Sequence, residues 1–401
     1  MSLNACIIAY TIYETDFRVA RYAKILSVLG YNVDVIALQN DGQPKFNVID
    51  EVNVYRVTQR DFNEKRKIDF AVKILKFFVL GAVRLLKNSL RKHYSIIHVH
   101  NVPDLLVFMA LPQKLGGAKI ILDIHDILPE FFCQKFGYNI NSKFAHFLSK
   151  IERSSVRFSD HVIVANDLWR NKLIERNQIE KQNCTTIMNY PRSAMLNSNT
   201  PRGLNEHFNL IYPGTLSYIH GLDVAIKAVA IAKNEIPNIR LNIYGAHPNH
   251  RIKNELDALI ASLNIGDIVK INGNIPANVL REKFKSTDIG IVPKRSGIFA
   301  SEAFSTKTLE YMAANVPVLS SKTKIDEFYF NNSMVKFFEP ANHEDMAKGI
   351  IELYHDPGKR FALAKNAKNF IAQNLWENKQ DLYIEVIQKL SNNHHCSALA
   401  N

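Results

Sequence analysis

The chain has 401 residues, of which 47% are hydrophobic and 22% charged, and these proportions exclude a disordered or fibrous protein. This length is large for one hydrophobic core and predicts two domains. The net charge of +12 favours an anionic partner.

The first half of the chain alternates strand-like and helix-like segments. Near-continuous apolar strands separated by helices indicate a parallel sheet that is covered on both faces. Gly30 follows one of the helical segments and is expected to end that helix. The expected strands span residues 5–10, 32–38, 52–57, 96–100, 119–123 and 161–165, and the expected helices span residues 17–29, 105–115 and 144–158.

A basic amphipathic helix is expected within residues 65–92, which hold nine Lys and Arg residues against one acid, Asp69. Its longest uncharged run is Phe77 to Val83, which is far shorter than the roughly 20 residues that span a bilayer. Such a helix is typical of proteins that bind anionic lipid surfaces, and the alternative is a helix packed on its own domain with a solvated basic face. The segment contains no recognised nucleic-acid motif, so no nucleic-acid partner is expected. The residues expected at the membrane are Lys73, Lys76, Phe77, Phe78, Arg84 and Lys87.

The composition changes at residues 189–202, which are rich in Asn, Ser and Pro, and this indicates an interdomain linker. A second alternation of strands and helices follows. The predicted organisation is an N-terminal acceptor-binding domain at residues 1–190, a linker at 191–202, a C-terminal nucleotide-sugar domain at 203–375, and a C-terminal helix at 376–391 that returns to the N-terminal domain. The fold class is α/β, with two Rossmann-like doubly wound domains facing across a cleft.

The second half carries the most informative motif. Glu302 and Glu310 enclose seven residues, and the second carboxylate lies in a helix that leads into a buried strand at 316–320. Ionised carboxylates make strong hydrogen bonds to hydroxyl groups, and a helix N-terminus between them offers free N–H groups to a diphosphate. This pattern resembles the E-x7-E motif of retaining glycosyltransferases of family 4, which have the GT-B fold. A chance pair of carboxylates at the start of a solvated helix is the alternative.

Two further segments support the resemblance. The turn from Tyr212 to Asp223 is similar to the glycine-rich start of the family's second domain, but Thr215 and His220 stand where the family has Arg and Lys. The segment from Asp123 to Glu130 is similar to the family's His-Asp motif. The resemblance implies that His125 and Glu302 are catalytic, and that the donor is bound by Gly214, Thr215, His220, Thr308, Leu309 and Glu310. Lys294 and Lys307 are expected to bind the donor as the nearest substitutes for the missing Arg and Lys.

The resemblance assigns a role to each group. His125 would meet the donor sugar, Glu302 would hold its hydroxyls and Glu310 would hold the ribose. Lys307 would bind the diphosphate. A structural core histidine and a solvated lysine are the respective alternatives for His125 and Lys307. Asp16, Arg18 and Asp126 are candidate acceptor or anion contacts, with Asp16 also a candidate helix N-cap. His98 and His100 point to one face of a strand, and we expect them to be buried and structural.

The predicted function is the transfer of a sugar, with retention, from a nucleotide-diphosphate sugar to a saccharide, expected to be lipid-linked, in surface polysaccharide or glycolipid synthesis. A UDP-sugar is favoured over a GDP-sugar. No cofactor is expected, and no metal either, because the Asp-x-Asp of metal-dependent transferases has no match. The alternatives are a GT-B sugar-nucleotide epimerase or hydrolase, and a catalytically silent sugar-nucleotide-binding protein; a phosphorylase would need a much longer chain.

The expected location is the cytoplasm, at the inner face of the cell membrane. The four cysteines are scattered and form no C-x-x-C pair, which favours a reducing compartment. No signal peptide is recognised at the N-terminus, where the first apolar run has only the length of a strand.

Overall fold

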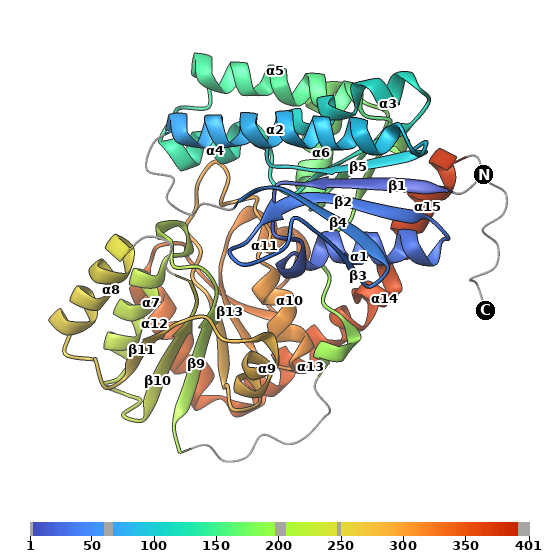
Figure 1. The fold of residues 1–401 in the computed structure, drawn as a ribbon. Coiled ribbons are helices and arrows are strands. Elements are labelled where there is room, and N and C mark those ends of the chain that lie inside the picture. The colour runs from blue at the N-terminus through green and yellow to red at the C-terminus, as the bar shows by residue number, and fades with distance from the viewer. Residues whose placement is uncertain (1–2, 60–66, 197–205, 247–249, 392–401) are drawn as a thin grey trace. The chain divides into compact units, whose positions relative to one another are not determined.

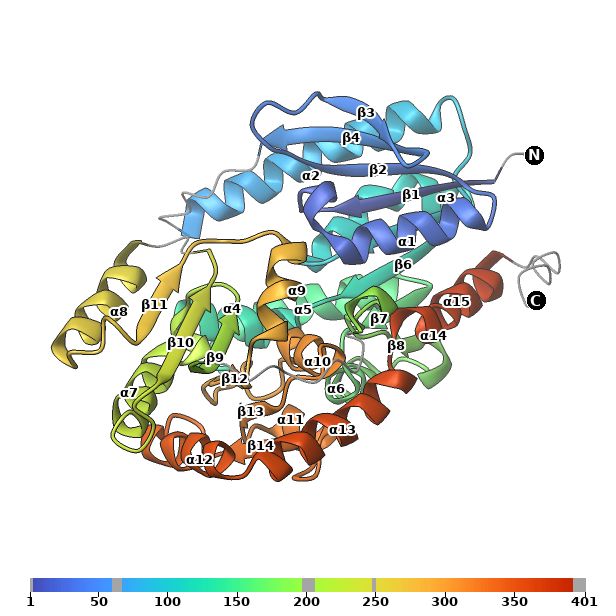
Figure 2. The same ribbon diagram turned by 90° about the horizontal axis from the view of Figure 1, so that it is seen from below.

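The computed structural model describes residues 3–59, 67–196, 206–246 and 250–391. The chain forms two compact units (Figures 1 and 2). Unit 1 comprises Met1–Asn189 together with Gln380–Asn401, and unit 2 comprises Tyr190–Lys379. The sequence placed the corresponding boundaries at residues 190 and 376.

Unit 1 is built on a sheet whose described part has eight strands in the order β3-β4-β2-β1-β5-β6-β7-β8. All neighbouring strands are parallel except β3 and β4. The order reverses direction between β1 and β5, and ligands of such sheets bind beyond the carboxyl ends of the strands at this point. The strands are β1 (Asn4–Ala9), β2 (Asn32–Gln39), β3 (Phe46–Ile49), β4 (Val52–Gln59), β5 (Ile96–His100), β6 (Lys119–Ile124), β7 (His161–Val164) and β8 (Cys184–Thr186).

Helices cover both faces of this sheet. Figure 1 shows α1 on one face and α2, α3 and α5 on the other. Helix α15 lies beside α1, where the rings of Tyr22 and Tyr383 are 4.2 Å apart. The helices of unit 1 are α1 (Phe17–Val28), α2 (Lys67–Ser89), α3 (Leu111–Leu115), α4 (Leu128–Phe136), α5 (Lys143–Phe158), α6 (Asp167–Asn177) and α15 (Asp381–Ser391).

Unit 2 has a parallel sheet, six-stranded in its described part, with the order β11-β10-β9-β12-β13-β14. Its order reverses between β9 and β12. The strands are β9 (Phe208–Pro213), β10 (Ile239–Tyr244), β11 (Val269–Asn272), β12 (Ile289–Val292), β13 (Val318–Ser321) and β14 (Val335–Phe338). The helices are α7 (Leu222–Ala232), α8 (His250–Ser262), α9 (Ala277–Lys285), α10 (Thr306–Ala313), α11 (Lys324–Tyr329), α12 (His343–His355), α13 (Pro357–Gln373) and α14 (Trp376–Lys379). The predicted α/β class with two Rossmann-like domains is confirmed.

Helix α2 confirms the predicted amphipathic helix but corrects which residues it exposes. Phe77 is fully buried, with its ring packed edge-on against Tyr10 at 5.2 Å, so it is not available to a membrane. Arg84 is half-buried, with its guanidinium over the ring of Tyr55, and Lys73 and Phe78 are also half-buried. Lys76 and Lys87 are exposed as predicted.

The opposite side of α2 carries an exposed apolar stripe. Its members recur every three or four residues, which places them on one helical face. We call them the α2 stripe, and they are Val72, Leu75, Val79, Val83, Leu86 and, just after the helix, Leu90. Across the part of the chain that the structure describes, none of the helices has both the length and the hydropathy that crossing a membrane requires.

Candidate active site

In unit 2, a glycine-rich turn joins β9 to α7, as the sequence predicted. Gly221 has a left-handed backbone and is the N-cap of α7, and a Cβ there would lie 1.9 Å from the carbonyl oxygen of Pro293. Gly214 also has a positive φ, and its missing side chain leaves room for Lys307, whose Cε would lie 2.4 Å from a Cβ at that position. Thr215 is exposed beside it. The turn thus brings Lys307 against the main chain at the end of β9.

Lys307 and Glu310 form the charged centre of this site. The ammonium of Lys307 lies 5.1 Å from the centroid of the Tyr212 ring. Burial lowers the pKa of Lys307 to about 8, with Glu310 opposing and Lys294 adding to that shift. Burial raises the pKa of Glu310, and Lys307 counteracts part of this effect. A buried lysine with a lowered pKa near a buried carboxylate is typical of a site that binds a charged ligand.

The other predicted donor contacts on this side are less available. Lys294 is buried, with its ammonium 3.0 Å from Asp326 and 2.8 Å from the carbonyl oxygen of Ala303. Burial lowers the pKa of His220 to about 3, with the positive charges of Lys307 and Lys294 contributing. His220 is therefore neutral near pH 7, and it offers no positive charge to a diphosphate. Lys307 is left as the cation best placed for a diphosphate.

The two-glutamate motif is held by its neighbours. Glu302 is 7% exposed and accepts a hydrogen bond of 2.8 Å from Lys324. The side chains of Thr308 and Leu309 are fully buried, so only their main chain is available to a donor. Tyr311 anchors the helix by donating from its hydroxyl to the carbonyl oxygens of residues 211 and 291, in β9 and β12. Glu310 is thereby fixed near the carboxyl end of the sheet.

In unit 1, His125 follows β6 in a loop that Asn101 organises. The Asn101 side chain accepts a hydrogen bond of 2.7 Å from the backbone N–H of His125 and donates to the carbonyl oxygen of Asp126 and to Asp104. The His125 side chain is 24% exposed, which agrees with a ligand contact better than with a core histidine. Burial raises the pKa of Asp126 to about 6, with His125 opposing that shift.

Arg18 does not present its guanidinium to solvent. Its Nε and Nη2 donate to both oxygens of Asp123 at 2.7 Å, and its Nη1 donates to the carbonyl oxygen of Ile187 and to Asn189. Burial alone would raise the pKa of Asp123, but Arg18 holds it well below its usual range. Arg18 was expected to contact an anionic ligand, but its guanidinium is already engaged by Asp123 within the protein. Asp16 caps α1 by accepting from the N–H groups of Arg18 and Val19, and its predicted N-cap role is confirmed.

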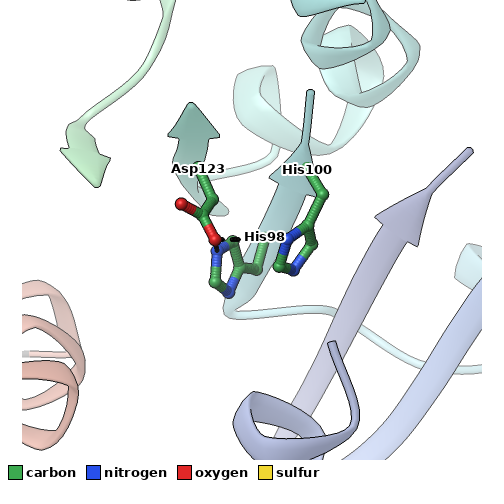
Figure 3. Close-up of side chains that lie close together, drawn as sticks. All are labelled: His98, His100 and Asp123. Carbon is green, nitrogen blue, oxygen red and sulfur yellow. Dashed lines mark ion pairs between the residues drawn. The ribbon is translucent and has the colours of Figure 1, made fainter. Parts of the chain in front are cut away.

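His98, His100 and Asp123 lie close together in unit 1 (Figure 3). Both histidines are buried, as expected, and their rings stack with centroids 4.4 Å apart. The three side chains have the spacing of metal ligands, with donor atoms within 4.8 Å of one another. Arg18, however, already spans both oxygens of Asp123 and neutralises its charge, so a divalent cation would meet a positive neighbour. The cluster therefore fits a hydrogen-bonded network better than a metal site.

Comparison with protein families identifies the chain. Residues 18–189 match the model described as Glycosyltransferase Family 4, and residues 201–370 match that of Glycosyl transferases group 1. The chain belongs to the family 4 type of glycosyltransferase. This glycosyltransferase is a transferase enzyme, and its two Rossmann-like units are those of the GT-B fold.

Individual relatives are distant. The glycosyltransferase is 26% identical over 163 residues to D-inositol 3-phosphate glycosyltransferase of Pseudarthrobacter chlorophenolicus, a match that covers 40% of this chain and 37% of the relative. Sucrose-phosphate synthase from Thermosynechococcus elongatus has a similar structure, with a TM-score of 0.76, 16% identity and coverage of 96% and 100%. Anabaena HepE in complex with UDP has a TM-score of 0.69, 15% identity and coverage of 98% and 100%. At this identity, the two structures support the fold alone.

Three polar residues that were given no role from the sequence hold predicted site residues in place within their own units. Asn101 orients the His125 loop, Asp123 pairs with Arg18, and Asp326 engages Lys294. All three are polar residues that are at most 7% exposed. Asn101 and Asp123 lie at or beside the carboxyl ends of predicted strands, where functional residues of parallel sheets gather. That position was a signal that could have identified them.

Proposed function

We propose that this glycosyltransferase moves a sugar, with retention of configuration, from a UDP-sugar to a saccharide hydroxyl. The observation that carries the proposal is the arrangement of Gly214, Lys307 and Glu310 at the carboxyl ends of β9 and β12. It offers a cation to a diphosphate and a carboxylate to ribose hydroxyls. HepE, a structural neighbour, was solved with UDP, which supports the choice of nucleotide.

The reaction follows from the groups available. The bond between the anomeric carbon and the phosphate oxygen breaks, and the acceptor oxygen bonds to that carbon from the same face. The acceptor proton passes to the departing phosphate oxygen, which serves as the base. Lys307 stabilises the charge on the departing diphosphate. His125 and Glu302 contact hydroxyls of the transferred sugar, and neither is needed as a base.

The donor assignment is tested with a thermal-shift panel of nucleotide diphosphates and nucleotide sugars, followed by turnover of the donor that binds. A ligand at 100 times its Kd stabilises the protein by roughly 2.7 kcal/mol. We expect UDP and one UDP-sugar to stabilise the wild type more than their GDP counterparts do. Stabilisation by GDP compounds alone would contradict the choice of base. Free sugar released from the donor at the full rate without an acceptor would indicate a hydrolase or epimerase.

We further propose that the acceptor is a lipid-linked saccharide in polysaccharide or glycolipid synthesis, and that unit 1 docks on an anionic membrane surface at the cytoplasmic face. The α2 stripe supplies apolar surface, flanked by exposed Lys76 and Lys87. Helix α5 lies on the same face of the sheet and exposes Phe147 among basic residues. Those basic residues are Lys143, Lys150, Arg153 and Arg157. Apolar side chains set among positive charges match a surface of anionic lipid headgroups.

The docking proposal is tested by co-sedimentation with vesicles of neutral lipid and with vesicles that contain anionic phosphatidylglycerol. We expect the wild type to bind the anionic vesicles and the double variant Leu75→Ser/Val79→Ser to bind them at least tenfold more weakly, because each side chain loses apolar burial. Phe361→Ser is the matched control, since Phe361 is equally exposed but lies in unit 2. Equal binding by the wild type and the double variant would refute docking through α2. Self-association that the double variant abolishes would assign the stripe to a second copy of the chain.

A further inference from the structure

His100 lies between the buried network of unit 1 and His125. Its Nδ1 is 2.9 Å from Nε2 of His125 and 3.2 Å from Oδ2 of Asp123. Its Nε2 is buried and has no hydrogen-bond partner among the described residues. The His100 ring stacks on the ring of His98 with centroids 4.4 Å apart, and its centroid lies 5.8 Å from that of Tyr22. His100 therefore acts on its surroundings through Nδ1.

The position of the His100 proton follows from this geometry. Burial lowers the pKa of His100, although Asp123 opposes that shift, so the ring is neutral and carries one N–H. A proton on Nε2 would leave a buried donor without an acceptor. An unsatisfied buried donor costs about 1–3 kcal/mol. The proton therefore resides on Nδ1, where the acceptors are.

The proton of His125 is then determined as well. Nε2 of His125 is 3.2 Å from Oδ2 of Asp123, and it could donate to that oxygen. Two N–H groups would then face each other across the 2.9 Å that separates the two rings, which is repulsive. Arg18 Nε already donates to the same Oδ2 at 2.7 Å and satisfies its charge. Nε2 of His125 is thus the acceptor of the His100 proton, and the single proton of a neutral His125 is on Nδ1.

We propose that His100 is a positioning residue that holds His125 in the Nδ1–H tautomer, so that His125 meets the transferred sugar as a hydrogen-bond donor. This inference rests on the proposed function for the identity of the partner at Nδ1. The tautomer itself does not depend on it. A ring that donates through Nδ1 cannot remove a proton there, which agrees with a reaction whose base is the leaving phosphate.

The direct test is long-range proton–nitrogen NMR of the full chain labelled with ¹⁵N-histidine, because this spectrum distinguishes the two neutral tautomers. The His125 signals are assigned by their loss in His125→Gln. We expect the Nδ1–H tautomer for His125 in the wild type at pH 7.5. A wild-type spectrum with the proton on Nε2 would overturn the inference, whatever the enzyme is found to catalyse.

Two variants of His100 test the positioning role. His100→Leu removes the donor, and His125 should change to the Nε2–H tautomer and donate to Asp123. His100→Asn keeps an N–H near the position of Nδ1 and should retain the wild-type tautomer. His161→Leu is the control, because His161 is also buried in unit 1 but pairs with Thr185 instead. An unchanged His125 tautomer in His100→Leu would refute the role of His100.

Steady-state kinetics of the same variants distinguish a failure of this inference from a failure of the proposed function. We expect kcat of His100→Leu to fall about tenfold to a hundredfold with little change in donor KM, since misplaced groups lower rates by such factors. His100→Asn and His161→Leu should remain within about threefold of the wild type. The tautomer of His125 could change in His100→Leu while kcat stays the same. That result would support the hydrogen-bond network but would show that His125 takes no part in the proposed reaction.

Discussion

The role of Lys307 gives the sharpest prediction about the donor site. We expect Lys307→Met to weaken UDP binding, because its ammonium would make a charge-assisted hydrogen bond to the diphosphate. Such a bond contributes about 1.5–3 kcal/mol, or roughly 10- to 150-fold in Kd. Lys294 is held by Asp326, and His220 is neutral near pH 7, so neither replaces the lost charge. The effect should therefore lie in the upper half of that range.

The pH dependence of UDP binding is a second, independent test of the role of Lys307. The pKa of Lys307 is about 8 without ligand, and only the protonated amine attracts the diphosphate. The affinity of the wild type should therefore fall as the pH rises through about 8, toward that of Lys307→Met. Between pH 7.5 and 8.5 the charge of UDP is nearly constant, since the second phosphate pKa is about 6 and the N3–H of uracil is still protonated. The variant should show no such decline.

Isothermal titration calorimetry of UDP at low salt between pH 7.5 and 8.5 measures both effects. Lys285→Met is the control variant, because it removes one positive charge from unit 2 at an exposed lysine that pairs with Glu282. Its Kd should match that of the wild type. A Kd for Lys307→Met within twofold of the wild type, or the same pH dependence in both proteins, would refute the assignment of Lys307 to the diphosphate.

Three further predictions concern neighbouring groups. Glu310→Gln should raise the donor KM at least tenfold with a smaller change in kcat, and steady-state kinetics that show an unchanged KM would remove Glu310 from the ribose. Gly221→Ala should lower the free energy of unfolding by about 1–3 kcal/mol or more in denaturant titrations, because the residue has a left-handed backbone and its Cβ would meet Pro293. Gly273→Ala, which meets nothing within 4 Å, should be near neutral, and equal losses would contradict this reading of Gly221. Asn101→Ala should lower kcat more than it changes donor KM, because it releases the His125 loop; a pure KM effect would argue against that.

Most strands of both sheets were predictable, because parallel strands covered on both faces are near-continuous apolar runs. The strands that escaped prediction lack that signature. β3 is an antiparallel edge strand that alternates exposed and half-buried positions, and β8 has only three residues. β14 has four residues and is only half-buried at its two central positions. Helices α11 to α13, in the last quarter of the chain, were not predicted from the sequence. The fold class therefore followed from periodicity, whereas the short and peripheral elements did not.

The candidate site divides in a similar way. Motif residues such as His125 and Glu310 could be proposed because the resemblance rests on local runs of sequence. The network behind them was not, because its partners are distant along the chain: Arg18 and Asp123 are separated by 105 positions, and His98 and Tyr383 by 285. Only the fold brings such pairs together. For this reason Arg18 was predicted to be a ligand contact, when its guanidinium is engaged inside the protein.

Helix α2 shows why periodicity alone can select the wrong face. Two sets of apolar residues in α2 recur at helical spacing: the buried residues Ile74, Phe77 and Leu85, and the exposed α2 stripe. The sequence pattern therefore does not tell which of the two faces packs on the domain. Gly81 distinguishes them: a Cβ there would lie 2.3 Å from Cε of Met109, so the helix packs closest where the side chain is absent. A glycine within an apolar helix therefore indicates the packed face, and Phe77, four residues earlier, belongs to the same face. Phe77, which was expected at the membrane, is consequently a core residue. The smaller aliphatic side chains of the α2 stripe form the exposed apolar surface.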